Sequence, residues 1–122
     1  MFKGEAVTSL SPAERKAAAI RLLPAIRGRI CKTEMKAGHF NDSPEVLEFV
    51  NATQLGELAP LGTSCPDHFL RTKIRPLIVP HDADGAALDT LIEGYRRDYA
   101  AYYNRCKHAN SPAMRDPNAV IY

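Results

Sequence analysis

Apolar residues recur at helical spacing in two long parts of the chain, residues 12–30 and residues 84–106. In the first part an apolar residue returns every three or four positions, at Ala19, Leu22, Leu23, Ile26 and Ile30. That spacing places the apolar residues on one face of a helix. An amphipathic helix with one face toward a core is therefore predicted.

The start of this first helix is marked by the sequence Ser11-Pro12-Ala13-Glu14. A serine can cap the helix, a proline suits its first position, and a glutamate three residues after the cap can complete a capping box. Pro24 lies inside the pattern, where it has no N–H and crowds the carbonyl of Ile20. A kink or a break into two helices is expected near Pro24.

The second long pattern begins after Asp82 or Asp84 and predicts the longest helix of the chain. One stripe collects its apolar and aromatic residues, which are Leu88, Leu91, Ile92, Tyr95, Tyr99, Tyr102 and Cys106. The tyrosines share the period of the stripe. They are therefore interpreted as packing residues rather than as a stacking platform for a ligand.

Two shorter helices are predicted from their first residues. Asp42-Ser43-Pro44-Glu45 is followed by a short apolar face, which predicts about two helical turns. Ser64 or Cys65 precedes Pro66, and Asp67 would lie in the first turn. One or two turns are therefore expected over residues 67–73.

Two short apolar runs, residues 77–80 and 119–122, flank the longest helix and are typical of strands. A strand, a helix and a strand in this order predict a right-handed crossover between parallel strands. The expected fold class is α/β, a helix-rich fragment with two short parallel strands joined by a long helix. Parallel strands are normally covered by more elements than these. Residues 1–122 are thus expected to form a single unit that is an incomplete domain and tends to self-associate.

Composition limits the classes of function. The chain is 45% hydrophobic and 25% charged, and its net charge of +2 is too small to imply nucleic acid as a partner. No segment approaches the ~20 apolar residues that span a bilayer, and the N-terminus has no apolar export signal. A cytoplasmic protein without a membrane partner is expected. The three cysteines show no CxxC pair and are interpreted as free thiols.

The string TSCPDHFLRTK, residues 63–73, carries the most suggestive chemistry in the chain. A helix start with basic and hydroxyl side chains one or two turns later would suit a phosphate or a carboxylate. The side chains concerned are His68, Arg71, Thr72, Lys73 and Arg75.

Two other interpretations of the same string are a catalytic triad and a purely structural helix. A nucleophile, base and acid drawn from Ser64, Asp67 and His68 are disfavoured, because neighbours on one helical turn cannot line up in series. The structural alternative is a capped helix whose Phe69 and Leu70 face the core while the charges face water.

No catalytic residue and no metal site are predicted within the chain. The histidines form no HxH, HxxxH or HExxH pattern and are scattered at His39, His68, His81 and His108. Tyr103 and Lys107 have the YxxxK spacing of short-chain dehydrogenases, but the seven glycines form no GxGxxG loop. That match is interpreted as a coincidence.

The sequence resembles a known family in the segments HFNDSPEVLEFVNA, ELAPLGTSCPDHFLRTKIRPLIVP, YRRDYAAYYNRCK and SPAMRDPNAVIY. These look like the middle of the bifunctional rhamnulose-1-phosphate aldolase/short-chain dehydrogenase proteins, also called rhamnulose-1-phosphate aldolase/alcohol dehydrogenase. Related class II aldolase/adducin-like proteins carry a variant of the Pro-Asp-His-x-x-Arg-Thr-Lys string. The resemblance covers nearly the whole chain.

This resemblance implies a sugar-catabolic enzyme that cleaves rhamnulose 1-phosphate to dihydroxyacetone phosphate and lactaldehyde and then oxidises the lactaldehyde with NAD. It implies a divalent metal, usually zinc, in an upstream aldolase module and NAD in a downstream dehydrogenase module. No cofactor is thus expected within this chain, and the isolated chain is expected to be inactive.

The residues that carry over by position are those of the shared string, expected to face a sugar phosphate or a nucleotide phosphate: Asp67, His68, Arg71, Thr72 and Lys73. Other modules of the same polypeptide are the further partners implied. The alternative is a non-catalytic interaction or scaffold domain, in which the charged string docks those modules.

Overall fold

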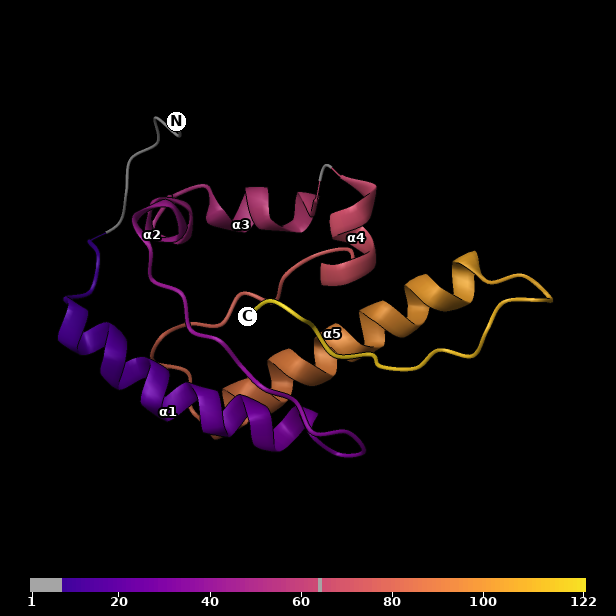
Figure 1. Cartoon of the computed structure of the whole chain (residues 1–122), viewed down its shortest axis with the longest axis horizontal. Helices are drawn as coiled ribbons and strands as arrows, with labels where there is room; N and C mark the ends of the chain where they lie inside the picture. The colour runs from indigo at the N-terminus through magenta and orange to yellow at the C-terminus, as the bar shows by residue number, and fades with distance from the viewer. Residues whose placement is uncertain (1–7, 64) are drawn as a thin grey trace. The chain divides into compact units, whose positions relative to one another are not determined.

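The computed structural model describes residues 8–63 and 65–122, and these form helices joined by loops (Figure 1). The helices in chain order are α1 Pro12–Ile30, α2 Pro44–Val50, α3 Leu55–Leu58, the 3-10 helix η1 Ala59–Leu61, α4 Pro66–Thr72 and α5 Gly85–Cys106. The chain divides into two compact units, Met1–Leu61 and Gly62–Tyr122. That residues 1–122 lie as one incomplete unit between an aldolase and a dehydrogenase module stays a prediction.

The prediction of an α/β fold with two parallel strands is wrong. Neither 77–80 nor 119–122 is a strand, and the described part of the chain contains no sheet. The two segments share one backbone hydrogen bond, in which the N–H of Leu77 donates to the carbonyl of Ile121 at 2.9 Å. Prolines without an N–H bound the first segment, and two short segments with no third neighbour are at best marginally stable as a ladder.

In the first unit, α1 begins with the predicted capping box. Ser11 Oγ accepts from the N–H of Glu14 at 3.3 Å, and Glu14 Oε2 accepts from the N–H of Ser11 at 2.8 Å. Of the kink or break expected near Pro24, the break does not occur, because one helix runs through Pro24. Of the predicted stripe, Ile26 is buried, whereas Leu23 is 38% exposed.

The second helix of this unit, α2, begins where the sequence predicts. Its Ser43 side chain makes no capping hydrogen bond, and the N–H of Ser43 instead donates to Asn41 Oδ1 at 3.0 Å. Arg15 Nε pairs with Asp42 Oδ2 at 3.2 Å, which ties α1 to the residues before α2. The residues just before α2 are therefore joined to α1 by a partly exposed ion pair, which contributes little stability by itself.

In the second unit, α5 provides most of the core, as its apolar stripe predicts. Asp84 caps the helix by accepting from the N–H of Ala87 at 2.8 Å. Leu88 is 1% exposed, and Ile92 and Tyr95 are also buried. The rest of this unit therefore packs mainly against α5.

The segment after α5 turns back along the helix to the C-terminus (Figure 1). The hydroxyl of Tyr103 donates to the carbonyl of Pro112 at 2.6 Å. Nearer the middle of the helix, Arg96 Nε donates to Asn118 Oδ1 at 2.8 Å. Ala119, the next residue, is buried. The closing segment is therefore fixed to α5 at several points.

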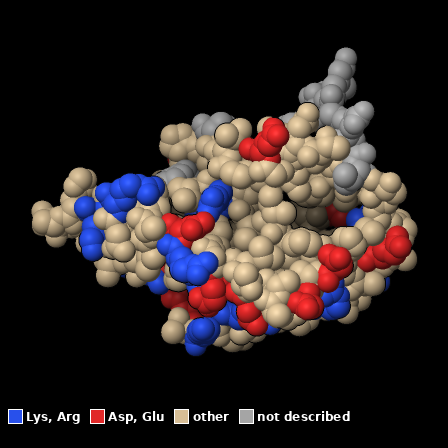
Figure 2. Space-filling view, turned by 180° about the vertical axis from the view of Figure 1, so that it is seen from behind, with Lys and Arg blue, Asp and Glu red and all other residues tan. Residues whose placement is uncertain are grey.

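Acidic and basic side chains are interspersed on the face shown in Figure 2, and they form no single basic field there. Interspersed surface charges contribute little to stability individually. None of the helices in the described ranges has both the length and the apolar character needed to cross a bilayer.

Candidate functional site

Within the string at 63–73, Pro66–Thr72 forms α4, a helix of seven residues that begins where its start signal predicts. Cys65 at the N-cap has extended backbone angles and makes no side-chain capping bond, and Pro66 occupies the first helical position. Thr72 Oγ1 donates to the carbonyl of His68 at 2.8 Å, within the helix. Ser64, the other predicted cap, lies outside the described residues.

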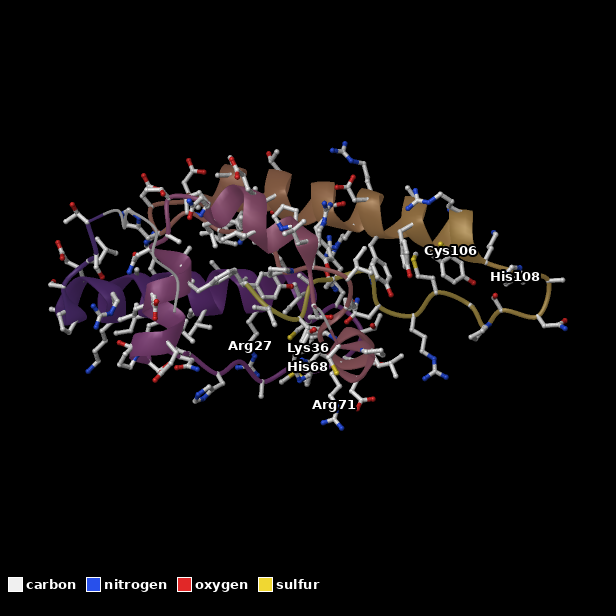
Figure 3. The ribbon with its side chains drawn as sticks, turned by 90° about the horizontal axis from the view of Figure 1, so that it is seen from above. Arg27, Lys36, His68, Arg71, Cys106 and His108 are labelled. Carbon is white, nitrogen blue, oxygen red and sulfur yellow. The ribbon has the colours of Figure 1, made fainter. Side chains whose placement is uncertain are left out.

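Three of the five predicted ligand residues, Asp67, His68 and Arg71, are exposed. Figure 3 shows His68 and Arg71 on α4, with Arg71 extending outward from the ribbon. Leu70 is 81% exposed, so the structural alternative in which Leu70 faces the core is wrong. The side chain of Phe69, the other residue in that alternative, is not described. The exposed residues leave α4 with both charged and apolar groups accessible to a partner.

The fifth predicted residue, Lys73, lies at the C-terminal end of α4 and is directed into the unit. Its Nζ donates to the carbonyl of Asn118 at 2.5 Å and to that of Asp116. The same ammonium lies 4.4 Å from the centroid of the Tyr99 ring. Lys73 is therefore occupied by internal contacts, in contrast to His68 and Arg71.

A polar network surrounds the Lys73 ammonium, formed by Lys73, Arg96, Asp116 and Asn118 and called here the Lys73 network. Asn118 is 7% exposed, and both its N–H, at 2.9 Å, and its Nδ2, at 2.7 Å, donate to Asp116 Oδ1. The Oδ1 of Asn118 accepts from Arg96 Nε. The sequence analysis did not predict these three partners. Asp116 and Asn118 lie in the polar run RDPN before the closing apolar residues, and Arg96 lies on α5.

Arg75, which sequence analysis grouped with the anion-binding side chains, is engaged on α5. Its guanidinium pairs with Asp98, and its carbonyl accepts from the hydroxyl of Tyr95 at 2.9 Å. Burial raises the pKa of Tyr95, and the nearby Arg75 charge opposes that rise. Arg75 thus joins the structural contacts of the unit.

Tyr122 extends the same cluster of ionisable groups. Partial burial raises the pKa of its phenol to about 12, and the charges of Asp116 and Tyr95 add to the rise while Arg96 opposes it. Removing a phenolic proton beside a carboxylate is unfavourable. At neutral pH the phenol of Tyr122 is therefore protonated.

Among the residues that the structure describes, no three His, Cys, Asp or Glu side chains gather closely enough to hold a metal ion. The hydroxyl of Tyr103 donates a hydrogen bond to the carbonyl of Pro112, and Lys107 Nζ lies 5.9 Å from the centroid of the Tyr103 ring. The YxxxK pair is thus placed in an ordinary packing contact at the end of α5. The exposed charged side chains of α4 are of the kind that bind an anion or a charged partner.

Comparison with known proteins identifies a family and a curated relative. The family described as aldolase class II, second domain, matches residues 17–122. The relative, from Bacillus subtilis (strain 168), is named "Uncharacterized oxidoreductase YuxG" and is 33% identical over 128 residues. That alignment covers 99% of this chain and 19% of the relative, so the chain spans about a fifth of the relative's length. No solved structure matches.

Proposed function

We propose that this chain, which belongs to the family of the aldolase class II second domain, supplies a substrate-phosphate contact to an aldolase-like enzyme. The proposed substrate is rhamnulose 1-phosphate, cleaved to dihydroxyacetone phosphate and lactaldehyde, and the lactaldehyde is then oxidised with NAD. The observation that carries the proposal is the family match over 17–122, which includes the exposed residues of α4. The oxidoreductase name of the relative supports the second reaction.

His68 and Arg71 are the residues proposed to bind the phosphate. They are three positions apart on α4, and residues at that spacing are neighbours on a helix surface. A guanidinium presents two parallel N–H groups to phosphate oxygens, and an imidazole can donate one more hydrogen bond. Asp67, also exposed, can accept hydrogen bonds from sugar hydroxyls. Thr72 and Lys73 are assigned no ligand contact, because their side chains bond to the protein itself.

The metal and the nicotinamide are assigned to parts of the parent protein outside residues 1–122. A divalent metal in this class of reaction stabilises the enediolate that forms when the carbon–carbon bond breaks. The described residues of this chain do not fit such an ion, because they form no cluster of metal-binding side chains. The role proposed for this chain is therefore to bind and orient substrate, together with other modules of the same polypeptide.

The test uses the complete gene product and two substitutions, His68→Ala and Arg71→Ala. Release of dihydroxyacetone phosphate from rhamnulose 1-phosphate is measured in a coupled assay. Loss of a charge-assisted hydrogen bond costs about 1.5–3 kcal/mol, so KM should rise about tenfold or more in Arg71→Ala. The unfolding temperature should stay unchanged, because both side chains are exposed.

Arg97→Ala is the matched control, since Arg97 is an exposed arginine on α5 in the same unit. It should leave KM and kcat at wild-type values. Unchanged kinetics in both α4 variants would contradict the proposal. A large loss of stability with normal activity per folded molecule would instead favour the scaffold alternative.

A further inference from the structure

The backbone of Lys73 has a conformation that side chains normally prevent. Its φ is 64° and its ψ is −171°, and it is the one non-glycine residue with a positive φ in the described ranges. This region of backbone space is occupied almost entirely by glycine. A lysine stays there only where the surrounding structure compensates for the strain.

The compensation is supplied by the side chain of the same residue. Its ammonium has three N–H donors, and two of them are taken by the carbonyls of Asp116 and Asn118. The ring of Tyr99, on α5, gives the ammonium a further favourable contact at 4.4 Å. Asp116 Oδ1 holds Asn118 through two hydrogen bonds, which fixes the acceptor carbonyls in place. The ammonium thus joins the end of α4 to α5 and to the closing segment.

On the N-terminal side of α4, the backbone of Gly62 lies very close to the backbone of Ile74. Gly62 has a φ of 73°, and a Cβ added to it would lie 2.0 Å from the carbonyl oxygen of Ile74. The backbones at 62 and 74 therefore meet, and residues 62–74 form a closed loop that contains α4. Lys73 lies directly at the base of this loop.

Among the described residues, little else holds the helix within the loop. None of its described side chains is buried. A helix of seven residues is too short to be stable in water without tertiary contacts. The contacts of Lys73 and Gly62 at the base of the loop are therefore what keeps the exposed residues of α4 in a fixed position.

We propose that Lys73 is a positioning residue, a latch that holds α4 in place so that His68 and Arg71 face the substrate phosphate. Lys73 itself contacts no ligand. The catalytic consequence rests on the proposed function, whereas the latch is a property of the fold that can be measured separately. The role of the ammonium is to fasten the C-terminal end of α4 to the closing segment and to Tyr99 on α5.

The test is Lys73→Met in the complete gene product, with amide hydrogen exchange and steady-state kinetics as the two measurements. Loss of charge-assisted hydrogen bonds should speed exchange in Pro66–Thr72 by about tenfold to a hundredfold. Exchange around Leu88 should change much less. KM for rhamnulose 1-phosphate should rise while kcat stays within about twofold, because only substrate positioning is lost.

Two further substitutions at the same position separate the side chain from the backbone. Lys73→Arg keeps a cation with several donors and should restore most of the protection of α4 and most of the wild-type KM. Lys73→Gly relieves the backbone strain but lacks the ammonium, so it should resemble Lys73→Met. Lys32→Met, an exposed lysine of the other unit, removes the same charge and should behave as wild type.

The inference is overturned if α4 exchanges equally fast in Lys73→Met and wild type, or if Lys73→Gly retains full protection. Faster exchange in Lys73→Met together with wild-type kinetics in His68→Ala and Arg71→Ala would refute the proposed function and support the latch. Should Lys73→Met fail to fold, Tyr99→Leu removes the ring contact alone. A smaller but measurable rise in α4 exchange is then expected, and no rise would overturn the inference.

Discussion

Asn118→Ala is the substitution expected to disturb the Lys73 network most directly. The asparagine side chain is the link between Arg96 and Asp116, at 2.8 Å and 2.7 Å respectively. It is also 7% exposed, so water cannot readily replace it. Alanine keeps the backbone groups, including the carbonyl that Lys73 contacts, and removes both side-chain hydrogen bonds.

The expected loss in free energy of unfolding follows from those two side-chain hydrogen bonds. Each involves a charged partner and is worth about 1.5–3 kcal/mol when intact. Arg96 keeps its ion pair with Glu93, and Asp116 still accepts from the N–H of Asn118, so the loss is smaller than the sum. The free energy of unfolding of the unit should fall by about 2–3 kcal/mol.

Native-state amide exchange of α5 in the complete gene product measures this loss. A fall of about 2–3 kcal/mol corresponds to roughly 30- to 150-fold faster exchange of the most protected amides, near Leu88 and Ile92. Asn110→Ala, in an exposed part of the closing segment, is the control and should leave the exchange unchanged. Exchange in Asn118→Ala that is less than about threefold faster would refute the view that the network stabilises this unit.

Three other predictions concern the same unit. Leu88→Ala, at a side chain 1% exposed, should lower the free energy of unfolding by about 2–5 kcal/mol in exchange measurements, and a loss below ~1 kcal/mol would contradict its place in the core. Gly62→Ala should cost more than about 1–2 kcal/mol, because the left-handed backbone and a 2.0 Å clash act together; wild-type exchange would refute this. The pKa of the Tyr122 phenol is raised from 10.0 to about 12. The protonated phenol therefore stabilises the folded state below pH 10, and this stabilisation is lost as the pH rises through 12. An ordinary tyrosine pKa in an absorbance titration would contradict this.

The positions of α1, α2, α4 and α5 were predictable because their signals are local, whereas α3 and η1 were not predicted. The capping box of Ser11 and Glu14 uses residues three apart, and Asp84 caps α5 through a residue three positions away. The stripe through Leu88 and Ile92 was likewise predicted from spacing alone, and both residues are buried. Hydrogen bonds and periodicity over one or two turns depend on little beyond the segment itself.

The strand predictions failed because a strand depends on partners elsewhere. Residues 77–80 and 119–122 have suitable side chains, but only one backbone bond, from Leu77 to Ile121, joins them. Apolar, β-branched composition shows that a segment fits a sheet and does not show that a sheet exists. The extended segments without a ladder are the result.

For the candidate site, only the exposure of its residues can be compared with the sequence, and the ligand role stays a prediction. The exposure of Asp67, His68 and Arg71 agrees with a charged surface on α4. The inward direction of Lys73 could not be read from the string, because its acceptor at Asn118 is 45 residues away. Contacts at that separation depend on the fold of the whole unit. The string alone therefore does not show whether each of its residues binds a ligand or stabilises the fold.

The measurement that tests the central claim most directly is the release of dihydroxyacetone phosphate from rhamnulose 1-phosphate by the complete gene product, compared between wild type and Arg71→Ala. The account predicts release by the wild type and a KM about tenfold or more higher in the variant, with the unfolding temperature unchanged. No release by a folded, metal-supplemented wild type, or equal KM values for the two proteins, would contradict it.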